Sequence, residues 1–332
     1  MHNAQLRHAA GAIVLALALV TGCGAAASDE PPAQAAATRV FAADNGQVTI
    51  PADPKRVVAT GYAVPVLIEA DAALVGISTW KRGLPLMAEE DRATYDRLEK
   101  VAGEAAAETN YEAIAKVKPD LIVIGVPQPV LADVDMERLK SIAPVVAIGP
   151  TIPSAWRELS QRQSDAAGRA TSFGQAKAVY EKKAAELATK YEDALAGTEF
   201  GHVGAYGEMA KGTFQREFAG AWGTNIAQDV GITYYGQVKE KGGGGRDVSE
   251  YPSIEELSQS LGQADAITYS VQPDGTPNEA VAYVLDSKLW KSLPAVKAGK
   301  VFPIRYTEAA TYESALKTLD AVDQALAPLL GS

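Results

Sequence analysis

The fold class is decided by residues 110–125, which read NYEAIAKVKPDLIVIG. The first part has the apolar spacing of a short amphipathic helix, and the Lys-Pro-Asp break ends that helix. Leu121–Gly125 is a continuous apolar run that closes on a glycine. Runs of this kind are typical of parallel strands that are covered on both faces. The stretch therefore predicts a helix followed by a buried parallel strand, which is the repeating unit of an α/β fold.

A similar pattern recurs in the second half of the chain. Residues 253–257 read SIEEL, and residues 264–269 read ADAITY. In both copies a glutamate lies in the first turn of the predicted helix, Glu112 in one and Glu255 in the other, and an aspartate opens the strand. The repetition predicts two similar α/β lobes, each with a glutamate on its surface.

Other short apolar runs predict further strands, at 56–59, 74–78, 145–148, 202–206, 266–269 and 301–304. The clearest helix signal covers residues 172–196, where Ser172 and Gln175 form a capping-box pattern and apolar residues recur at helical spacing. With a rise of 1.5 Å per residue this helix spans ~37 Å, which is longer than one small lobe needs. Residues 310–330 predict a closing amphipathic helix.

With these motifs, and above all the Pro-Asp-Leu-Ile block at 119–122, the chain resembles the substrate-binding proteins of bacterial ABC importers for iron–siderophore, haem and cobalamin uptake. The resemblance runs from about Arg39 to Leu330. It implies an α/β fold of two Rossmann-like lobes with central parallel sheets, joined by one long helix, with a ligand cleft between the lobes. The implied boundaries are 39–170 for the N-terminal lobe, 171–197 for the bridging helix and 198–332 for the C-terminal lobe with the closing helix.

The resemblance also gives Glu112 and Glu255 a role. They match the docking acids of the family, one in each lobe, which pair with arginines of the membrane permease. Glu256 adjoins Glu255 and is an alternative partner. An exposed glutamate in a first helical turn also stabilises the helix dipole, and this explanation suffices for either residue taken alone.

The first 22 residues are typical of a targeting segment. Arg7 precedes an apolar run at 9–20, which is too short to span a bilayer comfortably. Residues 20–23 read VTGC and resemble a bacterial lipobox, which implies cleavage before Cys23 and a lipid on its thiol. Residues 23–38 predict a flexible tether. We therefore expect the protein on the extracytoplasmic face of the membrane, held by the lipid anchor alone; a secretory peptide with a chance cysteine is the alternative.

Composition excludes several classes of protein. The formal net charge is −10 and no basic stripe appears, which argues against nucleic-acid binding. Cys23 is the only cysteine, and His202 is the only histidine after the signal peptide, where we expect it to be a core residue. This shortage argues against a direct zinc or manganese site. No Gly-x-Ser-x-Gly elbow, phosphate-binding loop or dinucleotide fingerprint is present, so we expect a protein that is not an enzyme and has no cofactor of its own. We also expect a monomer.

In a two-lobed α/β protein, ligands bind where the carboxyl ends of the strands face each other. This rule selects ten candidate ligand-binding residues: Tyr62, Trp80, Arg82, Gln128, Tyr206, Phe214, Arg216, Trp222, Arg305 and Tyr306. Aromatic rings and guanidinium groups suit an apolar chelate with oxygen acceptors. Any one of the aromatics could instead fill a lobe core, and Trp80, Arg82 and Trp222 are favoured for the ligand.

The predicted function is capture of a ferric siderophore and its delivery to an ABC permease. The chelator saturates the iron, so ferric iron travels inside the bound chelate and needs no protein ligand. A hydroxamate complex, of modest charge, is favoured over a strongly anionic triscatecholate. Haem or cobalamin binding by the same fold, a surface enzyme acting on siderophores, and a lipid-tethered sensory or adhesive module are the alternatives. We also expect a stiff pair of lobes, because one helix offers less hinge than extended strands.

Overall fold

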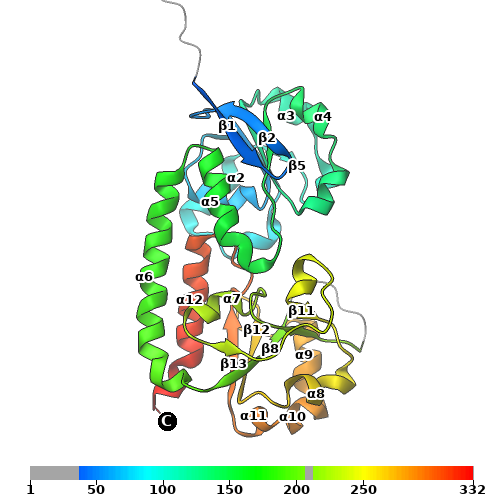
Figure 1. The fold of residues 1–332 in the computed structure, drawn as a ribbon, viewed down its shortest axis with the longest axis vertical. Helices are drawn as coiled ribbons and strands as arrows, with labels where there is room; N and C mark the ends of the chain where they lie inside the picture. The colour runs from blue at the N-terminus through cyan, green and yellow to red at the C-terminus, as the bar shows by residue number, and fades with distance from the viewer. Residues whose placement is uncertain (1–36, 206–211, 332) are drawn as a thin grey trace, which may run out of the picture. The chain divides into compact units, whose positions relative to one another are not determined.

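Two β-sheets, one in each half of the chain, form the framework of the computed structural model (Figure 1). The structure describes residues 37–205 and 212–331, which belong to one compact unit. The predicted signal peptide, Cys23 and Tyr206 lie outside the described residues. Within them, the predicted α/β fold with parallel central strands and one long helix is confirmed.

The N-terminal lobe contains five parallel strands in the order β5-β4-β3-β6-β7. These strands are β3 (Val57–Gly61), β4 (Leu74–Ser78), β5 (Lys100–Ala102), β6 (Leu121–Gly125) and β7 (Val145–Ala147). The helices of this half are α1 (Ala63–Glu69), α2 (Glu89–Arg97), α3 (Tyr111–Lys116), α4 (Met136–Lys140) and α5 (Trp156–Ala166). Every residue of β6 is buried, so the apolar run that decides the fold class is a strand covered on both faces.

An antiparallel hairpin of β1 (Thr38–Ala43) and β2 (Gly46–Pro51) precedes this sheet. We did not predict it. Its sequence signal is present, because Asp44-Asn45-Gly46 is a run of turn-forming residues: Asp44 and Asn45 connect the strands, and Gly46, which opens β2, has a positive φ of 108°.

The C-terminal lobe has a second sheet, in the order β11-β9-β8-β12-β13, with β10 paired to β8. Its strands are β8 (Glu199–Gly204), β9 (Gln215–Glu217), β10 (Thr233–Tyr234), β11 (Ser249–Glu250), β12 (Ala266–Val271) and β13 (Val301–Arg305). Its helices are α7 (Asn225–Asp229), α8 (Leu257–Leu261), α9 (Glu279–Asp286), α10 (Lys288–Ser292) and α11 (Pro294–Lys297). The central strands β8, β12 and β13 are parallel as predicted, but β9 runs antiparallel to β8, so this sheet is mixed.

The aspartate that opens a strand in each lobe holds the start of the neighbouring strand. Asp120, before β6, accepts hydrogen bonds from the backbone N–H groups of Lys55 (2.7 Å) and Arg56 (2.9 Å), just before β3. Asp265, before β12, accepts one from the N–H of Glu199 (3.0 Å), the first residue of β8. Since β6 pairs with β3 and β12 pairs with β8, the repeated motif in the sequence is the same structural device used twice.

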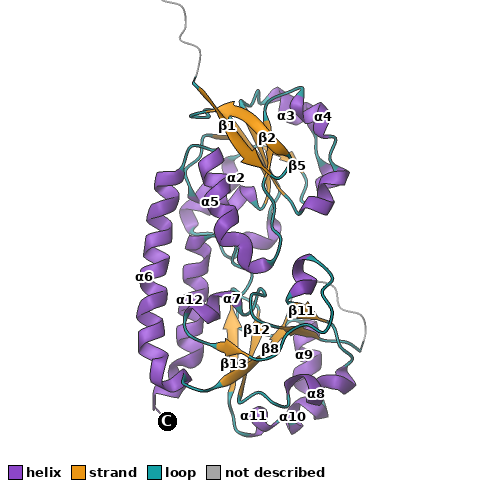
Figure 2. Cartoon of the chain, in the orientation of Figure 1, coloured by secondary structure: helices purple, strands orange, loops and turns teal. Residues whose placement is uncertain are grey.

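Two helices lie side by side along one flank of the molecule, α6 (Ala170–Leu195) and α12 (Tyr312–Leu326) (Figure 2). Lys190 pairs with Asp323 at 2.5 Å, and the Tyr191 hydroxyl donates to the Asp323 carbonyl at 2.8 Å. Helix α6 begins two residues before Ser172, so the predicted capping box does not form. No helix in the described ranges has both the length and the apolar character that crossing a membrane requires.

An aromatic core joins these helices to the N-terminal half of the chain. Trp156 of α5, Tyr180 of α6 and Tyr312 of α12 meet edge to face, with Tyr312 4.8 Å from Trp156 and 5.4 Å from Tyr180 between ring centroids. The Trp156 indole N–H also donates to Asn225 of α7 at 2.9 Å. Residues of both halves therefore share one packed core, which is consistent with the stiffness that we expect of the pair.

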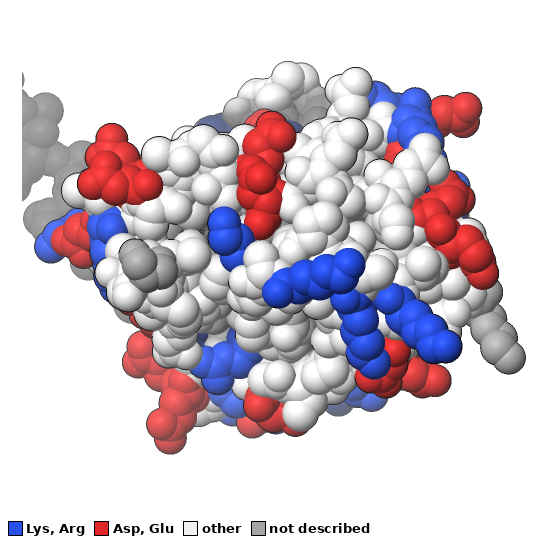
Figure 3. All heavy atoms as spheres, turned by 90° about the horizontal axis from the view of Figure 1, so that it is seen from below, with Lys and Arg blue, Asp and Glu red and all other residues white. Residues whose placement is uncertain are grey.

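Charged side chains of both signs are interspersed on the end of the molecule seen from below (Figure 3).

Candidate ligand-binding cleft

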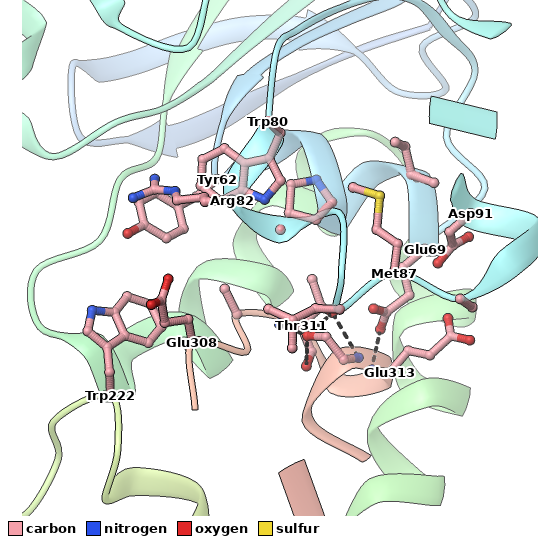
Figure 4. Close-up of a pocket in the computed structure, with 17 residues that line it drawn as sticks. Tyr62, Glu69, Trp80, Arg82, Met87, Asp91, Trp222, Glu308, Thr311 and Glu313 are labelled. Atoms are coloured by element: carbon pink, nitrogen blue, oxygen red, sulfur yellow. Dashed lines mark hydrogen bonds between the residues drawn. The ribbon is translucent and has the colours of Figure 1, made fainter. Parts of the chain in front are cut away.

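Three aromatic side chains from the two lobes meet between the sheets (Figure 4). Tyr62 follows β3, Trp80 follows β4, and Trp222 precedes α7. The Tyr62 and Trp80 rings meet at 65° with centroids 4.9 Å apart, whereas Tyr62 and Trp222 stack within 4° at 6.2 Å. Because β3 and β4 are adjacent parallel strands, their carboxyl ends deliver Tyr62 and Trp80 to the same edge of the sheet.

Two glycines make this arrangement possible. Gly61 has a φ of 60°, and a Cβ there would lie 2.6 Å from the Gly125 carbonyl oxygen, which accepts the Tyr62 N–H at 2.8 Å. A Cβ on Gly83 would lie 2.2 Å from the Trp80 indole nitrogen. A side chain at Gly61 would force apart this close approach of two backbone segments, and one at Gly83 would displace the Trp80 ring.

The Arg82 guanidinium lies over two of these rings. Its central carbon is 4.1 Å from the Trp80 ring centroid and 4.7 Å from that of Tyr62. Both distances are within the range of cation–π attraction. Four of the ten candidate residues, Tyr62, Trp80, Arg82 and Trp222, thus line one pocket.

Four carboxylates also line this aromatic pocket, whose volume is about 560 Å³ including space open to solvent. They are Glu69, Asp91, Glu308 and Glu313. Burial raises the pKa of Glu69 to about 8, although hydrogen bonds from Thr311 and from the Glu313 N–H, at 3.0 Å, act in the opposite direction. Burial also raises the pKa of Asp91 to about 7, and the adjacent Glu313 adds to this shift. This part of the pocket favours neutral or positively charged groups.

Glu308 lines the aromatic pocket and lies two residues beyond Tyr306. Tyr306 comes directly after β13 (Val301–Arg305) and has a φ of 60°, and its carbonyl accepts the Thr318 hydroxyl at 2.6 Å. Such a backbone conformation is uncommon for a tyrosine and is found at ligand sites. Burial raises the pKa of Glu308, and the positive charge of Arg82 acts against that shift.

A second pocket, of about 600 Å³ including open space, adjoins the first and shares Arg82, Leu86 and Glu308 with it. Ser270 and Tyr306, both from the C-terminal lobe, also line it. We refer to the aromatic pocket and this second pocket together as the cleft. Among the described residues, no group of three or more His, Cys, Asp or Glu side chains is placed to hold a metal ion.

The other sequence-predicted ligand residues lie elsewhere. Gln128 is exposed at the start of a 3₁₀ helix, and Arg305 donates to Gln324 with its guanidinium 5.7 Å from the Tyr306 ring centroid. Phe214 is fully buried in the apolar core of the C-terminal lobe. None of these three lines either pocket of the cleft.

Arg216 is also buried, and its guanidinium interacts with groups inside the C-terminal lobe. It lies between the rings of Phe218 (4.7 Å) and Tyr235 (4.8 Å) and donates to the Tyr235 carbonyl at 3.1 Å. Since β9 is an antiparallel strand, Arg216 lies in the sheet and not in a loop at a carboxyl end. It does not line the cleft pockets.

The neighbouring His202 is a core residue, as expected. It is fully buried on β8, 2.7 Å from the Thr268 hydroxyl and 3.4 Å from a Glu217 oxygen. Burial lowers the pKa of His202 to about 3 and raises the pKa of Glu217 to about 7. Burial therefore favours a neutral imidazole and a Glu217 that is readily protonated.

The two predicted docking glutamates are exposed, one in each lobe. Glu112 is in the first turn of α3, where Asn110 caps the helix by accepting the Ala113 N–H at 3.0 Å. Its side chain is 89% exposed, with Arg138 at 3.9 Å. Glu255 lies in a 3₁₀ turn and accepts from Ser253, and the adjacent Glu256 pairs with Lys239 at 3.3 Å. Of the two neighbours, Glu255 is the more exposed.

Sequence reasoning missed the four carboxylates. Glu308 lies two residues beyond Tyr306, so extending the carboxyl-end rule past β13 would have found it. Glu69, Asp91 and Glu313 come from helices α1, α2 and α12. No local pattern marks them, because only the packing of the two halves brings these helices to one pocket.

Comparison with known proteins agrees with this architecture. The family model described as "Periplasmic binding protein" matches residues 57–306. The iron(3+)-hydroxamate-binding protein YxeB of Bacillus subtilis (strain 168) is 25% identical over 301 residues, which cover 88% of this chain and 87% of that protein.

Two solved structures illustrate the similarity of the fold. The siderophore periplasmic binding protein from the fuscachelin gene cluster of Thermobifida fusca has a TM-score of 0.66 and 31% identity, covering 85% of this chain and 99% of that one. Staphylococcus aureus SirA, solved with staphyloferrin B, has a TM-score of 0.67 at 22% identity, with coverages of 87% and 99%, and shows the same fold. Since the family model spans most of the sequence, the chain belongs to the periplasmic binding protein family.

Proposed function

We propose that this protein is an extracytoplasmic solute-binding protein that captures a ferric siderophore, with the hydroxamate class favoured, and delivers it to an ABC permease. The observation that carries the proposal is the wall of Tyr62, Trp80 and Trp222 with the Arg82 guanidinium, contributed by both lobes to one cleft. Aromatic faces suit the apolar body of a chelate, and guanidinium donors suit its oxygen atoms.

The relatives support the choice of ligand. YxeB is named as an iron(3+)-hydroxamate-binding protein, and the Thermobifida fusca structure is of a siderophore periplasmic binding protein. When the chelator already saturates the iron, the protein binds the complex through complementary shape, apolar contacts and hydrogen bonds alone. We therefore propose that ferric iron is carried within the bound chelate and that the protein contributes no metal ligand and no catalytic group.

The remaining parts of the proposal concern location and delivery. Cys23 would carry the lipid anchor after removal of residues 1–22, and the mature protein would work as a monomer at the extracytoplasmic face of the membrane. Glu112 and Glu255, exposed on different lobes, would dock to arginines of the permease. Replacing Cys23 by Ser should release the protein from cells into the soluble fraction, whereas retention in the membrane would contradict the anchor.

Tryptophan fluorescence tests the ligand. The chain has four tryptophans: Trp80 and Trp222 line the cleft, whereas Trp156 and Trp290 are buried in apolar cores. We would titrate residues 24–332 with a ferric hydroxamate, a ferric catecholate, haem and cobalamin. Saturable quenching by the ferric hydroxamate, and not by its iron-free form, is expected.

Two variants show whether the signal comes from the cleft. Trp222→Phe should weaken both the quenching and the affinity, and Trp290→Phe should change neither. Saturation by haem or cobalamin alone would identify one of them as the cargo, and silence across the panel would overturn the proposal. Mass spectrometry of the released chelate should recover it intact; a cleaved product would support the enzyme alternative.

A further inference from the structure

The charges that line the cleft are unequal in sign. Among the described residues that line the two pockets, Arg82 is the only Lys or Arg, whereas Glu69, Asp91, Glu308 and Glu313 all line the aromatic pocket. Of these acids, Glu308 alone also lines the second pocket, so a ligand in either part of the cleft lies near its carboxylate. A strongly anionic chelate would be repelled by the Glu308 carboxylate, and Arg82 alone would offset that repulsion.

The aromatic faces next to Glu308 already hold a cation. The Arg82 guanidinium lies over the Trp80 and Tyr62 rings, and its charge acts on the Glu308 carboxyl. In Figure 4 the Glu308 carboxylate lies beside the Trp222 ring and points toward Tyr62 and Arg82. Aromatic faces with a carboxylate beside them form the kind of cage that recognises ammonium groups. The contact of Arg82 with these rings therefore indicates that this part of the cleft accepts a cationic group.

We propose that the cleft selects a ferric chelate that carries a protonated amine, and that Glu308, flanked by Tyr62 and Trp222, is the residue that receives this amine. The inference rests on the proposed function and specifies its ligand further. A ferric trihydroxamate is neutral at its iron centre, so an amine on its tail gives the whole complex a positive charge. The iron centre would lie in the cleft and the amine would replace part of the contact that Arg82 now makes.

A matched pair of ligands tests this proposal on the unmodified protein. The first is a linear ferric trihydroxamate that ends in a primary amine, and the second is the same chelate with that amine acetylated. Both present the same iron centre, and only the first has the ammonium charge. Calorimetric titration at pH 7 and low salt should give at least a tenfold lower Kd for the amine form, and the ratio should shrink in 0.5 M salt because charge–charge attraction is screened.

Variants assign the effect to its residue. Glu308→Gln keeps the size of the side chain and should bring the two Kd values within twofold of each other, mainly by weakening binding of the amine form. Glu186→Gln, an exposed glutamate on α6, is the control and should preserve the tenfold ratio. Circular dichroism would verify that both variants are folded.

The outcomes separate the two proposals. If both chelates bind the wild-type protein equally well, the siderophore function stands and the amine selection is wrong. If the ratio survives in Glu308→Gln, Glu308 is not the selecting residue. If neither chelate binds, the proposed function fails and the selection fails with it.

Discussion

Replacing Glu69 by Gln should make the protein more stable above neutral pH. Glu69 lies at the contact between α1 and the start of α12, where its Oε1 accepts the Glu313 N–H at 3.0 Å. A glutamine keeps this acceptor and the size of the side chain, and it imitates the protonated form of the acid. The variant should therefore match the wild type at pH 5 and exceed it in stability at pH 8.

The sign follows from the pKa. Burial raises the pKa of Glu69 from 4.5 to about 8, so between these values the folded protein holds a proton that the unfolded chain has released. The stabilisation is complete below pH 4.5 and is lost as the pH rises through 8. One such group changes the free energy of unfolding by up to about 1.4 kcal/mol per pH unit, or roughly 4 kcal/mol at most between pH 5 and pH 8.

Urea denaturation followed by far-UV circular dichroism at pH 5, 6, 7 and 8 would measure the difference. Asp91, whose pKa is raised to about 7, titrates in the same direction and remains in both proteins. The informative quantity is therefore the gap between variant and wild type, which should widen with pH. Glu240→Gln, at an exposed position, should show no widening gap. Parallel profiles for Glu69→Gln and the wild type would refute the reasoning.

Three further predictions concern the cleft and the framework. Gly83→Ala should weaken binding of the ferric chelate about tenfold or more in the fluorescence titration, because a Cβ there would lie 2.2 Å from the Trp80 indole nitrogen; unchanged affinity would show that this ring is not a ligand contact. Asp120→Ala and Asp265→Ala should each lower the free energy of unfolding in urea by about 0.5–1.5 kcal/mol, since each removes the acceptor of exposed N–H groups at a strand start, and an unchanged free energy would contradict this role. Small-angle scattering with and without ligand should give closely similar curves, and a large compaction would contradict the stiffness that the aromatic core around Trp156 suggests.

The strands that sequence alone located well are those with continuous apolar runs. The predictions for β4 and β6 match their observed limits, because both are parallel strands bounded by clear breaks. Strands β9, β10 and β11 have two or three residues each, which is too few for any periodicity to register. Strands β9 and β10 pair with β8, and β11 pairs with β9, so all three depend on the assembled sheet.

The cleft was predictable to the extent that it follows from strand ends. Tyr62 comes directly after β3, and Trp80 and Arg82 follow β4 within four residues, so the carboxyl-end rule places them where the structure has them. The same rule put Arg216 in the cleft because an antiparallel β9 was not foreseen. Glu69, Asp91 and Glu313 come together only because helices from both ends of the chain pack against each other. Glu69 and Glu313 are more than 200 positions apart, so no local sequence pattern predicts their contact.

The packing of α6, α12 and Trp156 has a consequence for transport. If Glu112 and Glu255 dock to a permease as proposed, and if the lobes keep their spacing when the cleft fills, the empty and the loaded protein would present nearly the same pair of glutamates to it. Empty protein would then compete with loaded protein for the same docking site. Uptake would fall once copies of the binding protein outnumber the available chelate, and overproducing the protein in iron-poor cells would slow iron import instead of speeding it.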